Sequence, residues 1–459
     1  MNKQEFPGRH LGLKHLKHRI AGPKRLPSGF PSGQQLWLAG FILLPYASYG
    51  GLLILAGLLF AAMGSRGQRV WRLCGQYGFG WLSAGLLLSA SFGINRGDGF
   101  LQLTNFLPFF VFWGVLATHP KALADPFRRL ETMARWLLVT SIPLSAIAVV
   151  EYVLKFEQIA VQVQAMPLPA AFLSWLYEVP SYGHRAHSLF NHPNGLSAYL
   201  VMILGLGLGL ALKALVDGKA LVDGKALVDR RDRTFRQGSH RAIRLAVPIA
   251  VALCLAAIFC TGSRNGLLIA LVLVAIALYA ARRDRWAMLL GLGGSAALVA
   301  AALSFGIGGR SLSLAIFTQD PRIGVWRLTI EMIRQRPWLG WGFSGLRELY
   351  IPYSIPDYEV IHHAHNVWLF LASEAGIPVM LGFCWIVGRL YYTAIHTYLK
   401  GGLPAGHRAV LLSYLLAFTA CLLFGLFDVV LFDSRANIVA WGLLAALYLM
   451  SPSNLDQRI

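Results

Sequence analysis

Three histidines lie close together at the end of a long polar segment, at His362, His363 and His365. His365 is followed by Asn366 and then by an apolar run. A neutral imidazole can accept a proton near neutral pH, so His365 is suited to act as a general base for a hydroxyl nucleophile. A histidine hydrogen-bonded at a membrane interface would have the same sequence signature, and which of the three imidazoles acts stays open.

A metal site is a further interpretation of the histidines. Three more imidazoles precede an apolar run upstream, at His184, His187 and His192. However, no carboxylate or cysteine stands at the spacing that metal-binding motifs use. We therefore predict no metal and no cofactor.

Two arginines could hold an anion. Arg185 and Arg264 each lie just before an apolar run, beside glycine and asparagine residues that favour turns. The N-terminus of a helix is a good site for a phosphate group, and the planar guanidinium binds phosphate through two parallel hydrogen bonds. A contact with lipid headgroups is the alternative.

Glu374 lies inside the apolar run that begins after His365. An ionisable residue in a membrane span is costly to bury and is therefore a functional candidate. A salt bridge to one of the arginines is the alternative role. We assign Glu374 and Asn366 to the site as supporting residues.

The elements that must position these residues are membrane helices. The chain has 459 residues, of which 56% are hydrophobic and only 14% charged, with a mean hydropathy of +0.55. A soluble protein of this length would carry many more charges. Apolar runs recur along the whole sequence, which predicts an all-α polytopic membrane protein. We predict twelve spans, near residues 36–49, 50–63, 73–92, 101–117, 136–154, 195–212, 245–260, 266–281, 286–305, 366–387, 409–427 and 437–450.

Lysine and arginine are distributed unevenly between the two sides of these spans. If residues 36–63 form two spans and the N-terminus is cytoplasmic, 30 of the 41 Lys and Arg residues lie on the cytoplasmic side. This positive-inside bias favours two spans over one long kinked helix and predicts that both termini are cytoplasmic. The net charge of +20 is thus a sign of topology, with an inner face near anionic lipid, and does not indicate nucleic-acid binding.

The predicted organisation is one membrane domain with polar attachments. A basic cytoplasmic tail spans residues 1–35 and the transmembrane domain residues 36–451. A basic cytoplasmic loop at 213–244 contains a six-residue repeat, and a large periplasmic loop spans 307–364. No apolar core follows the basic tail until Leu36, so we expect the first spans to replace a cleaved signal peptide.

The large loop holds six arginines on the side where arginine is usually scarce, at Arg310, Arg322, Arg327, Arg334, Arg336 and Arg347. Asp320 and Pro321 are typical of an N-cap and a first helical position, so they predict a short amphipathic helix. Its apolar face is predicted at Ile323, Trp326, Ile330 and Ile333, and its polar face at Arg327, Glu331 and Arg334.

Taken in order, these motifs resemble those of the O-antigen ligase/polymerase superfamily of bacterial envelope glycosyltransferases. The resemblance covers about residues 180–390. Its motifs are Arg185, Phe190-Asn-His-Pro-Asn-Gly195, Gly262-Ser-Arg-Asn-Gly266, Arg322-Ile-Gly-Val-Trp-Arg327, Arg336-Pro-Trp-Leu-Gly-Trp-Gly342, His365-Asn366 and Glu374-Ala-Gly376.

The resemblance implies a GT-C-like fold in the bacterial inner (plasma) membrane and a polyprenyl-diphosphate-linked glycan as donor. It implies that His365 is the base, that Arg185 and Arg264 bind the diphosphate, and that Arg322 and Arg327 assist them. The acceptor would be a lipid or another glycan. The leaving diphosphate is already activated, so a metal is not needed in principle.

We therefore predict a ligase or polymerase of cell-envelope polysaccharide, such as lipopolysaccharide, that acts on the periplasmic side. Ligase and polymerase differ only in the acceptor, and both remain open, as does transfer of glycan onto protein. A membrane transporter of a small anion such as bicarbonate is the alternative from another class. It would place its unusual residues near mid-membrane, whereas here they cluster in loops. A non-catalytic assembly scaffold is a third possibility.

Overall fold

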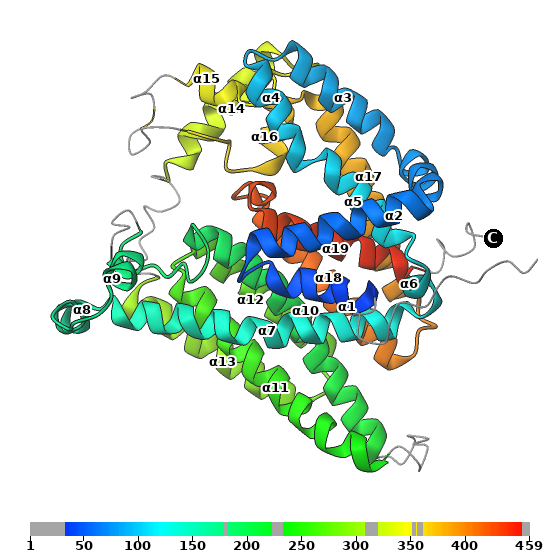
Figure 1. Cartoon of the computed structure of the whole chain (residues 1–459). Helices are drawn as coiled ribbons and strands as arrows, with labels where there is room; N and C mark the ends of the chain where they lie inside the picture. The colour runs from blue at the N-terminus through cyan, green and yellow to red at the C-terminus, as the bar shows by residue number, and fades with distance from the viewer. Residues whose placement is uncertain are drawn as a thin grey trace, which may run out of the picture.

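The computed structural model describes residues 33–177, 182–222, 233–307, 320–350, 355 and 361–451, and the elements in these ranges are helices (Figure 1). In chain order they are α1 (Gly33–Leu43), α2 (Ser48–Tyr77), α3 (Phe79–Phe92), α4 (Arg96–Gln102), η1 (Leu103–Asn105), α5 (Leu107–Ala117), α6 (Pro120–Ala124), α7 (Pro126–Leu154), α8 (Glu157–Gln164), α9 (Ala170–Tyr177), α10 (Pro193–Val222), α11 (Arg233–Cys260), α12 (Arg264–Ala281), α13 (Arg285–Phe305), α14 (Arg322–Gln335), α15 (Gly345–Leu349), α16 (Val367–Glu374), α17 (Ile377–Lys400), α18 (Ala405–Phe424), η5 (Val430–Phe432) and α19 (Ser434–Leu449).

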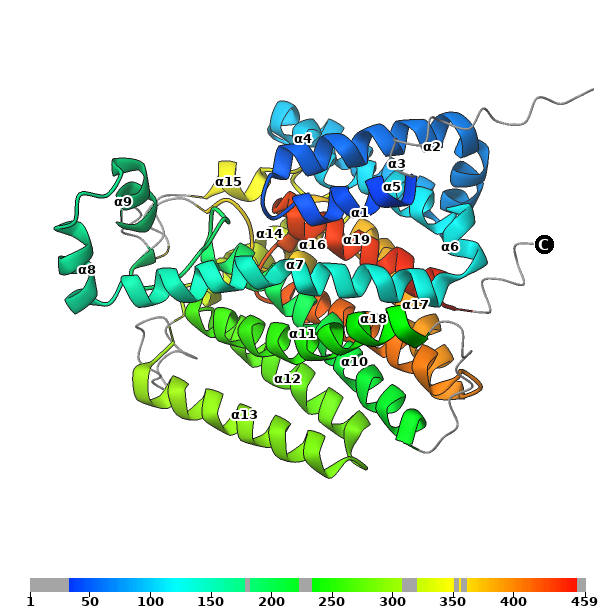
Figure 2. The same cartoon turned by 60° about the horizontal axis from the view of Figure 1, so that its bottom comes forward.

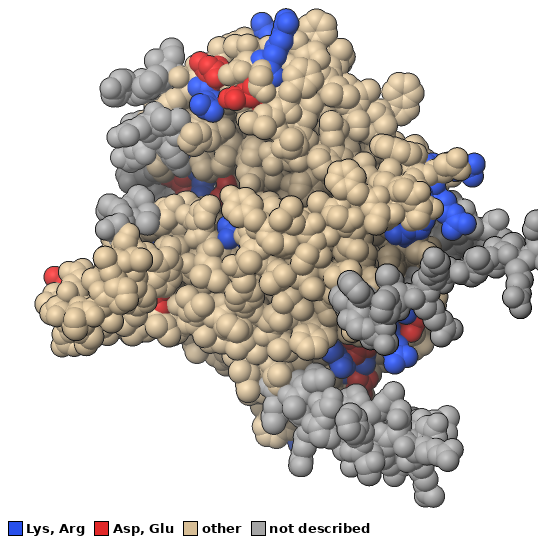
Figure 3. Space-filling model, viewed as in Figure 1, with Lys and Arg blue, Asp and Glu red and all other residues tan. Residues whose placement is uncertain are grey.

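The prediction of a polytopic helical membrane protein is confirmed. Among the described residues, eight helices are long and apolar enough to cross a membrane, and three more apolar helices are shorter. The long helices lie side by side in one bundle, and α8 and α9 protrude from one end of α7 in both views (Figures 1 and 2). On the face seen in Figure 3, charged atoms gather near the edges and most of the surface carries none, as expected for a surface in contact with lipid.

The first predicted span, 36–49, is too short to cross a membrane. Helix α1 has 11 residues, which corresponds to about 17 Å of helix. It forms a hairpin with α2, in which a Cβ at Gly51 would lie only 2.9 Å from the carbonyl oxygen of Gly40. The predicted break between residues 63 and 73 is also wrong: α2 continues as a helix to Tyr77, where Gly78 ends it with a φ of 86°.

The predicted span 366–387 is broken into α16 and α17. The break lies at Gly376, which has a φ of 90°. The chain at Trp338 passes so close that a Cβ at position 376 would lie 2.2 Å from the carbonyl oxygen of Trp338. The backbone N–H of Ile377 donates to the carbonyl oxygen of Pro337 at 2.8 Å. The middle of the large loop, just after α14, is therefore fastened at this break.

The predicted helix within the large loop is present as α14, and the side chain of Asp320 accepts a hydrogen bond from the N–H of Arg322 at 2.9 Å. Its predicted apolar face is wrong, because the buried residues are Val325, Thr329 and Met332, while Ile330 is 40% exposed. The helix packs on α16 rather than against a flat membrane surface, and this contact selects a different face.

Helices α10 and α18 form the closest long contact in the bundle. A Cβ at Gly205 would lie 2.4 Å from the backbone nitrogen of Ala417, and one at Gly209 would lie 2.4 Å from the Cα of Ser413. On each helix the two small residues are four positions apart: Gly205 and Gly209 on α10, and Ser413 and Ala417 on α18. They therefore lie on one face of each helix and form a flat stripe at which the two backbones meet. This contact fixes the start of α10 relative to the loop that follows α18.

Three of the segments predicted to be cytoplasmic lie close together where the structure describes them. Arg66 donates to the carbonyl oxygen of Thr118 at 2.9 Å, and the rings of Phe127 and His407 stack with centroids 4.3 Å apart. These two contacts bring together parts of the segments near residues 64–72, 118–136 and 389–408.

We predict that Gly209→Ala destabilises the protein by about 1–3 kcal/mol, because the added methyl group has no room beside Ser413. The unfolding temperature of the detergent-solubilised protein would measure this. Gly293→Ala is the matched control, because nothing lies within 4 Å of a Cβ there and alanine is the better helix former. Equal unfolding temperatures for the two variants would contradict the proposed packing.

Candidate functional site

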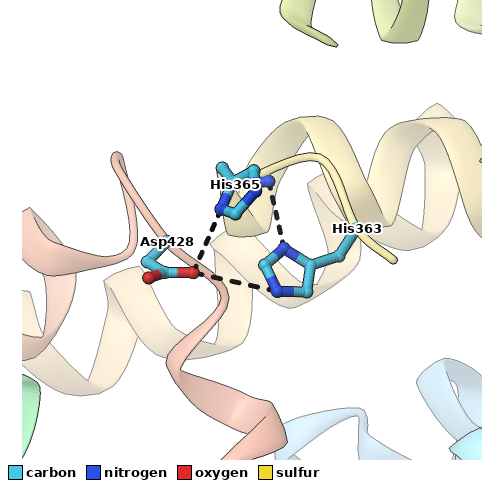
Figure 4. Close-up of side chains that lie close together, drawn as sticks. All are labelled: His363, His365 and Asp428. Carbon is cyan, nitrogen blue, oxygen red and sulfur yellow. Dashed lines mark hydrogen bonds and ion pairs between the residues drawn. The ribbon is translucent and has the colours of Figure 1, made fainter. Parts of the chain in front are cut away.

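The side chains of His365 and Asp428 meet at the end of the bundle opposite the basic segments (Figure 4). His365 lies just before α16, and Asp428 lies in the loop between α18 and α19. The Nδ1 atom of His365 is 3.5 Å from Oδ1 of Asp428. A carboxylate at Nδ1 places the proton of a neutral imidazole there and leaves Nε2 as the proton acceptor.

The backbone holds His365 firmly in this position. Its φ of 48° is in the left-handed region, which costs energy for a residue other than glycine. Asn366 caps α16 by accepting from the N–H groups of Trp368 and Leu369, and its side-chain nitrogen donates to the carbonyl oxygen of Leu426 at 3.1 Å. Asn366 thus ties the histidine to the loop that carries Asp428.

His363 completes the cluster from the side. Its ring stacks on Phe432 and meets the His365 ring edge-on at a centroid distance of 4.4 Å. The backbone N–H of His365 donates to Nδ1 of His363 at 3.3 Å, so the proton of His363 is on Nε2, 3.9 Å from the same Asp428 oxygen. Burial lowers the pKa of His363 to about 4, so it is neutral near pH 7.

Asp428 is the charged centre of this cluster. Burial by itself raises the pKa of its carboxyl, but the hydrogen bond from His365 and the charges of the two histidines and Arg322 outweigh burial and hold the pKa well below its usual range. Asp428 is therefore ionised throughout the physiological range. A fixed negative charge beside an imidazole stabilises the imidazolium that forms when the ring takes up a proton.

A chain of hydrogen bonds connects Asp428 to Arg185. The side chain of Asn194, at the start of α10, donates to Oδ2 of Asp428 at 3.2 Å. Its own oxygen accepts from the guanidinium of Arg185 at 2.6 Å, and Arg185 also donates to the carbonyl oxygen of Thr261 at 2.8 Å. Arg185 is only 6% exposed, so its orientation is set by these partners.

The other predicted arginines differ in their distance from the cluster. Arg264 lies in the same turn as Thr261, as the first residue of α12, and it is partly buried. Arg322 lies at the start of α14, and its charge acts on Asp428 and His363. Arg327 is on the exposed face of α14, and no contact with the cluster is present among the described residues. Arg310 lies outside the described residues.

Glu374 has a structural role. Its carboxylate accepts hydrogen bonds from the N–H groups of Gly345 and Leu346, at 2.7 and 2.8 Å, and so binds the start of α15. The alternative of a salt bridge to an arginine is wrong for the described residues, because these backbone groups occupy both carboxylate oxygens. Glu374 holds the turn that follows the large loop's helix against α16.

His363, His365 and Asp428 could together hold a metal ion, since their ligand atoms lie within 4.8 Å of one another. The hydrogen bond from the N–H of His365 to Nδ1 of His363 argues against this. A ring whose Nδ1 accepts a hydrogen bond carries its proton on Nε2, the atom that would have to bind the metal. The arrangement fits a hydrogen-bonded acid–base cluster better than a metal centre.

Sequence reasoning missed Asp428 and Asn194 as site residues. In the sequence, Asp428 is one carboxylate in a short loop between two apolar runs, and Asn194 is part of a Pro-Asn-Gly turn. His192 enters the sequence analysis only as a metal ligand, but its Nδ1 accepts the N–H of Asn194 at 3.0 Å. Burial, together with the charge of Arg185, lowers the pKa of His192 to about 4, so this ring is neutral near pH 7. One sequence signal could have pointed to Asp428. It is a carboxylate in a segment on the same predicted side of the membrane as His365, so it is a candidate partner for that imidazole.

The comparisons with known proteins agree with the resemblance of the motifs. A family model described as O-antigen ligase matches residues 249–384, which contain Arg264, Arg322, His365 and Asn366. Arg185 and Asp428 lie outside the matched range. No curated protein matches the chain. Residues 249–384 of this multi-pass membrane protein are therefore an O-antigen ligase family domain.

Proposed function

We propose that this protein is a glycosyltransferase that moves a glycan from a polyprenyl-diphosphate carrier to a hydroxyl group of a lipid or glycan acceptor. The family domain supports the class of enzyme and its lipid-linked substrate. The observation that carries the mechanism is the pair formed by His365 and Asp428, linked through Asn194 to Arg185. The distribution of lysine and arginine over the later loops supports a periplasmic position for this site and a cytoplasmic C-terminus.

His365 acts as the general base in this proposal. Its Nε2 takes the proton of the acceptor hydroxyl while the hydroxyl oxygen attacks the anomeric carbon of the donor sugar. The bond between that carbon and the phosphate oxygen breaks, and the polyprenyl diphosphate leaves with the bonding electrons. Asp428 holds the ring in the orientation that exposes Nε2 and stabilises the imidazolium.

The arginines stabilise the leaving diphosphate. Arg185 and Arg264 lie on neighbouring turns, because Arg185 is hydrogen-bonded to Thr261 in the turn before α12. Arg322 adds positive charge from α14, next to the histidine cluster. Positive charges that are fixed before the reaction stabilise developing negative charge without reorganisation. We keep Arg327 only as a more remote helper, since it lies on the exposed face of its helix.

We predict that His365→Ala abolishes surface glycan in a deletion strain complemented with this gene, because no base remains to activate the acceptor. Lipid-linked precursor should accumulate, and its gel pattern separates two activities: single units indicate a polymerase and full chains a ligase. His362→Ala is the matched control, since His362 is exposed and lies outside the cluster with Asp428. Normal glycan with His365→Ala would rule out the proposed base and leave a scaffold as the better account.

We predict that Asp428→Asn lowers kcat by about 100-fold or more, because the amide can no longer stabilise the imidazolium. The KM for the donor should change much less, since Asp428 does not touch the diphosphate in this mechanism. Steady-state kinetics with purified protein would measure both. Asp433→Asn is the control, because Asp433 pairs with Arg435 and not with the histidines. A loss confined to KM would contradict the role given to Asp428.

We predict that chelation leaves the reaction intact. The diphosphate is neutralised by arginine, and the Nε2 proton of His363 argues against metal binding by the cluster. Transfer activity measured after dialysis against EDTA should equal that of untreated protein. A loss that added Zn²⁺ or Mg²⁺ restores would show that the reaction depends on a metal.

A further inference from the structure

A buried group of polar residues lies behind Arg185, on the side away from Asp428. Glu151 lies near the end of α7 and is 0% exposed, although it is an acidic residue in a candidate membrane span. Lys155, one helical turn later, is 8% exposed. Burying two charged side chains at such a place is costly, so their partners indicate what they do.

The carboxylate of Glu151 is surrounded by hydrogen-bond donors. Lys155 donates to it from Nζ at 2.7 Å. The backbone N–H of His187 lies 3.0 Å and that of Ser188 lies 2.7 Å from Oε2. These two backbone donors belong to the loop that immediately follows Arg185.

Lys155 forms the second link to the same loop. Its Nζ donates to the carbonyl oxygen of Arg185 at 2.9 Å, in addition to Glu151. The ion pair therefore binds the backbone on both sides of Ala186. Lys155 binds the carbonyl oxygen of Arg185, and Glu151 binds the N–H groups of His187 and Ser188. The guanidinium of Arg185 points the other way, to Thr261 and Asn194.

The backbone at Ser188 needs this support. Its φ of 51° lies in the left-handed region, although serine is not glycine. Such a conformation persists only where surrounding contacts determine it. The carboxylate of Glu151 accepts the N–H of Ser188 itself, so it stabilises the strained residue directly.

We propose that Glu151, together with Lys155, is a positioning residue that holds Arg185 in the orientation in which it binds the donor diphosphate. This inference rests on the proposed function. Glu151 does not touch the substrate in this proposal and acts only through the loop that carries Arg185. Its charge is needed because it must bind two backbone N–H groups and an ammonium group at once.

The test is a double-mutant cycle in the purified full-length protein, with the donor KM and the kcat as readouts. Glu151→Gln should raise the donor KM about tenfold, the effect of losing one charged hydrogen bond. In an Arg185→Lys background the same change should alter KM less than about twofold, because residues that act through one group are not additive. The KM of the acceptor should stay unchanged.

Two controls keep this test independent of folding. Glu131→Gln removes a carboxylate that pairs with Arg135 and Lys213 at the other end of α7, so it should leave the donor KM unchanged. The double variant Glu151→Gln with Lys155→Met leaves no unpaired buried charge. It should raise the donor KM as Glu151→Gln does while the protein stays folded, as judged by its unfolding temperature.

The outcomes separate this inference from the function on which it rests. If Arg185→Lys leaves the donor KM unchanged, Arg185 does not bind the diphosphate and the proposed function fails at that residue. If Arg185→Lys raises the donor KM but Glu151→Gln leaves it unchanged, only the positioning role is overturned. The same holds if Glu151→Gln lowers activity equally in the wild-type and the Arg185→Lys backgrounds. A KM effect of Glu151→Gln that vanishes in the Arg185→Lys background supports it.

Discussion

The geometry of the site depends on the close contact between α10 and α18. Glycine on one helix meets serine and alanine on the other at backbone distance, so the two helices can neither slide nor separate without losing that contact. Asn194 lies at the start of α10, and Asp428 follows the end of α18. Their 3.2 Å hydrogen bond thus results from packing in the bundle, and through it the arginine side of the site meets the histidine side.

The membrane architecture was predictable because hydrophobicity and the distribution of positive charge are properties of the whole chain. Positions of most spans follow from runs of apolar residues. Helix continuity was less predictable, because it depends on single residues and their neighbours. Residues 64–72 are polar and basic, yet α2 passes through them, while the apolar run after His365 breaks at Gly376, where the large loop packs. The buried face of α14 was missed for the same reason, since α16 and not the membrane covers it.

The site was predictable in part. His365 and the arginines were visible from residue type and position at the starts of apolar runs. Asp428 was not, because it is about sixty residues further along the chain, and only packing brings its loop to the histidine. Asn366 was predicted as a supporting residue, and the structure gives it a definite task as the cap of α16 and the tie to the Asp428 loop. Glu374 was predicted as a supporting residue, and its carboxylate accepts hydrogen bonds from the backbone N–H groups of Gly345 and Leu346 at the start of α15.

Two loops of the site contain a residue other than glycine with a left-handed backbone, Ser188 and His365. Each is held by contacts that form when the chain folds. The conformational entropy of these loops is therefore lost at folding and not when substrate binds. A long, flexible lipid-linked glycan loses much freedom on binding, so a receptor that is already ordered leaves more of the interaction energy available for holding it.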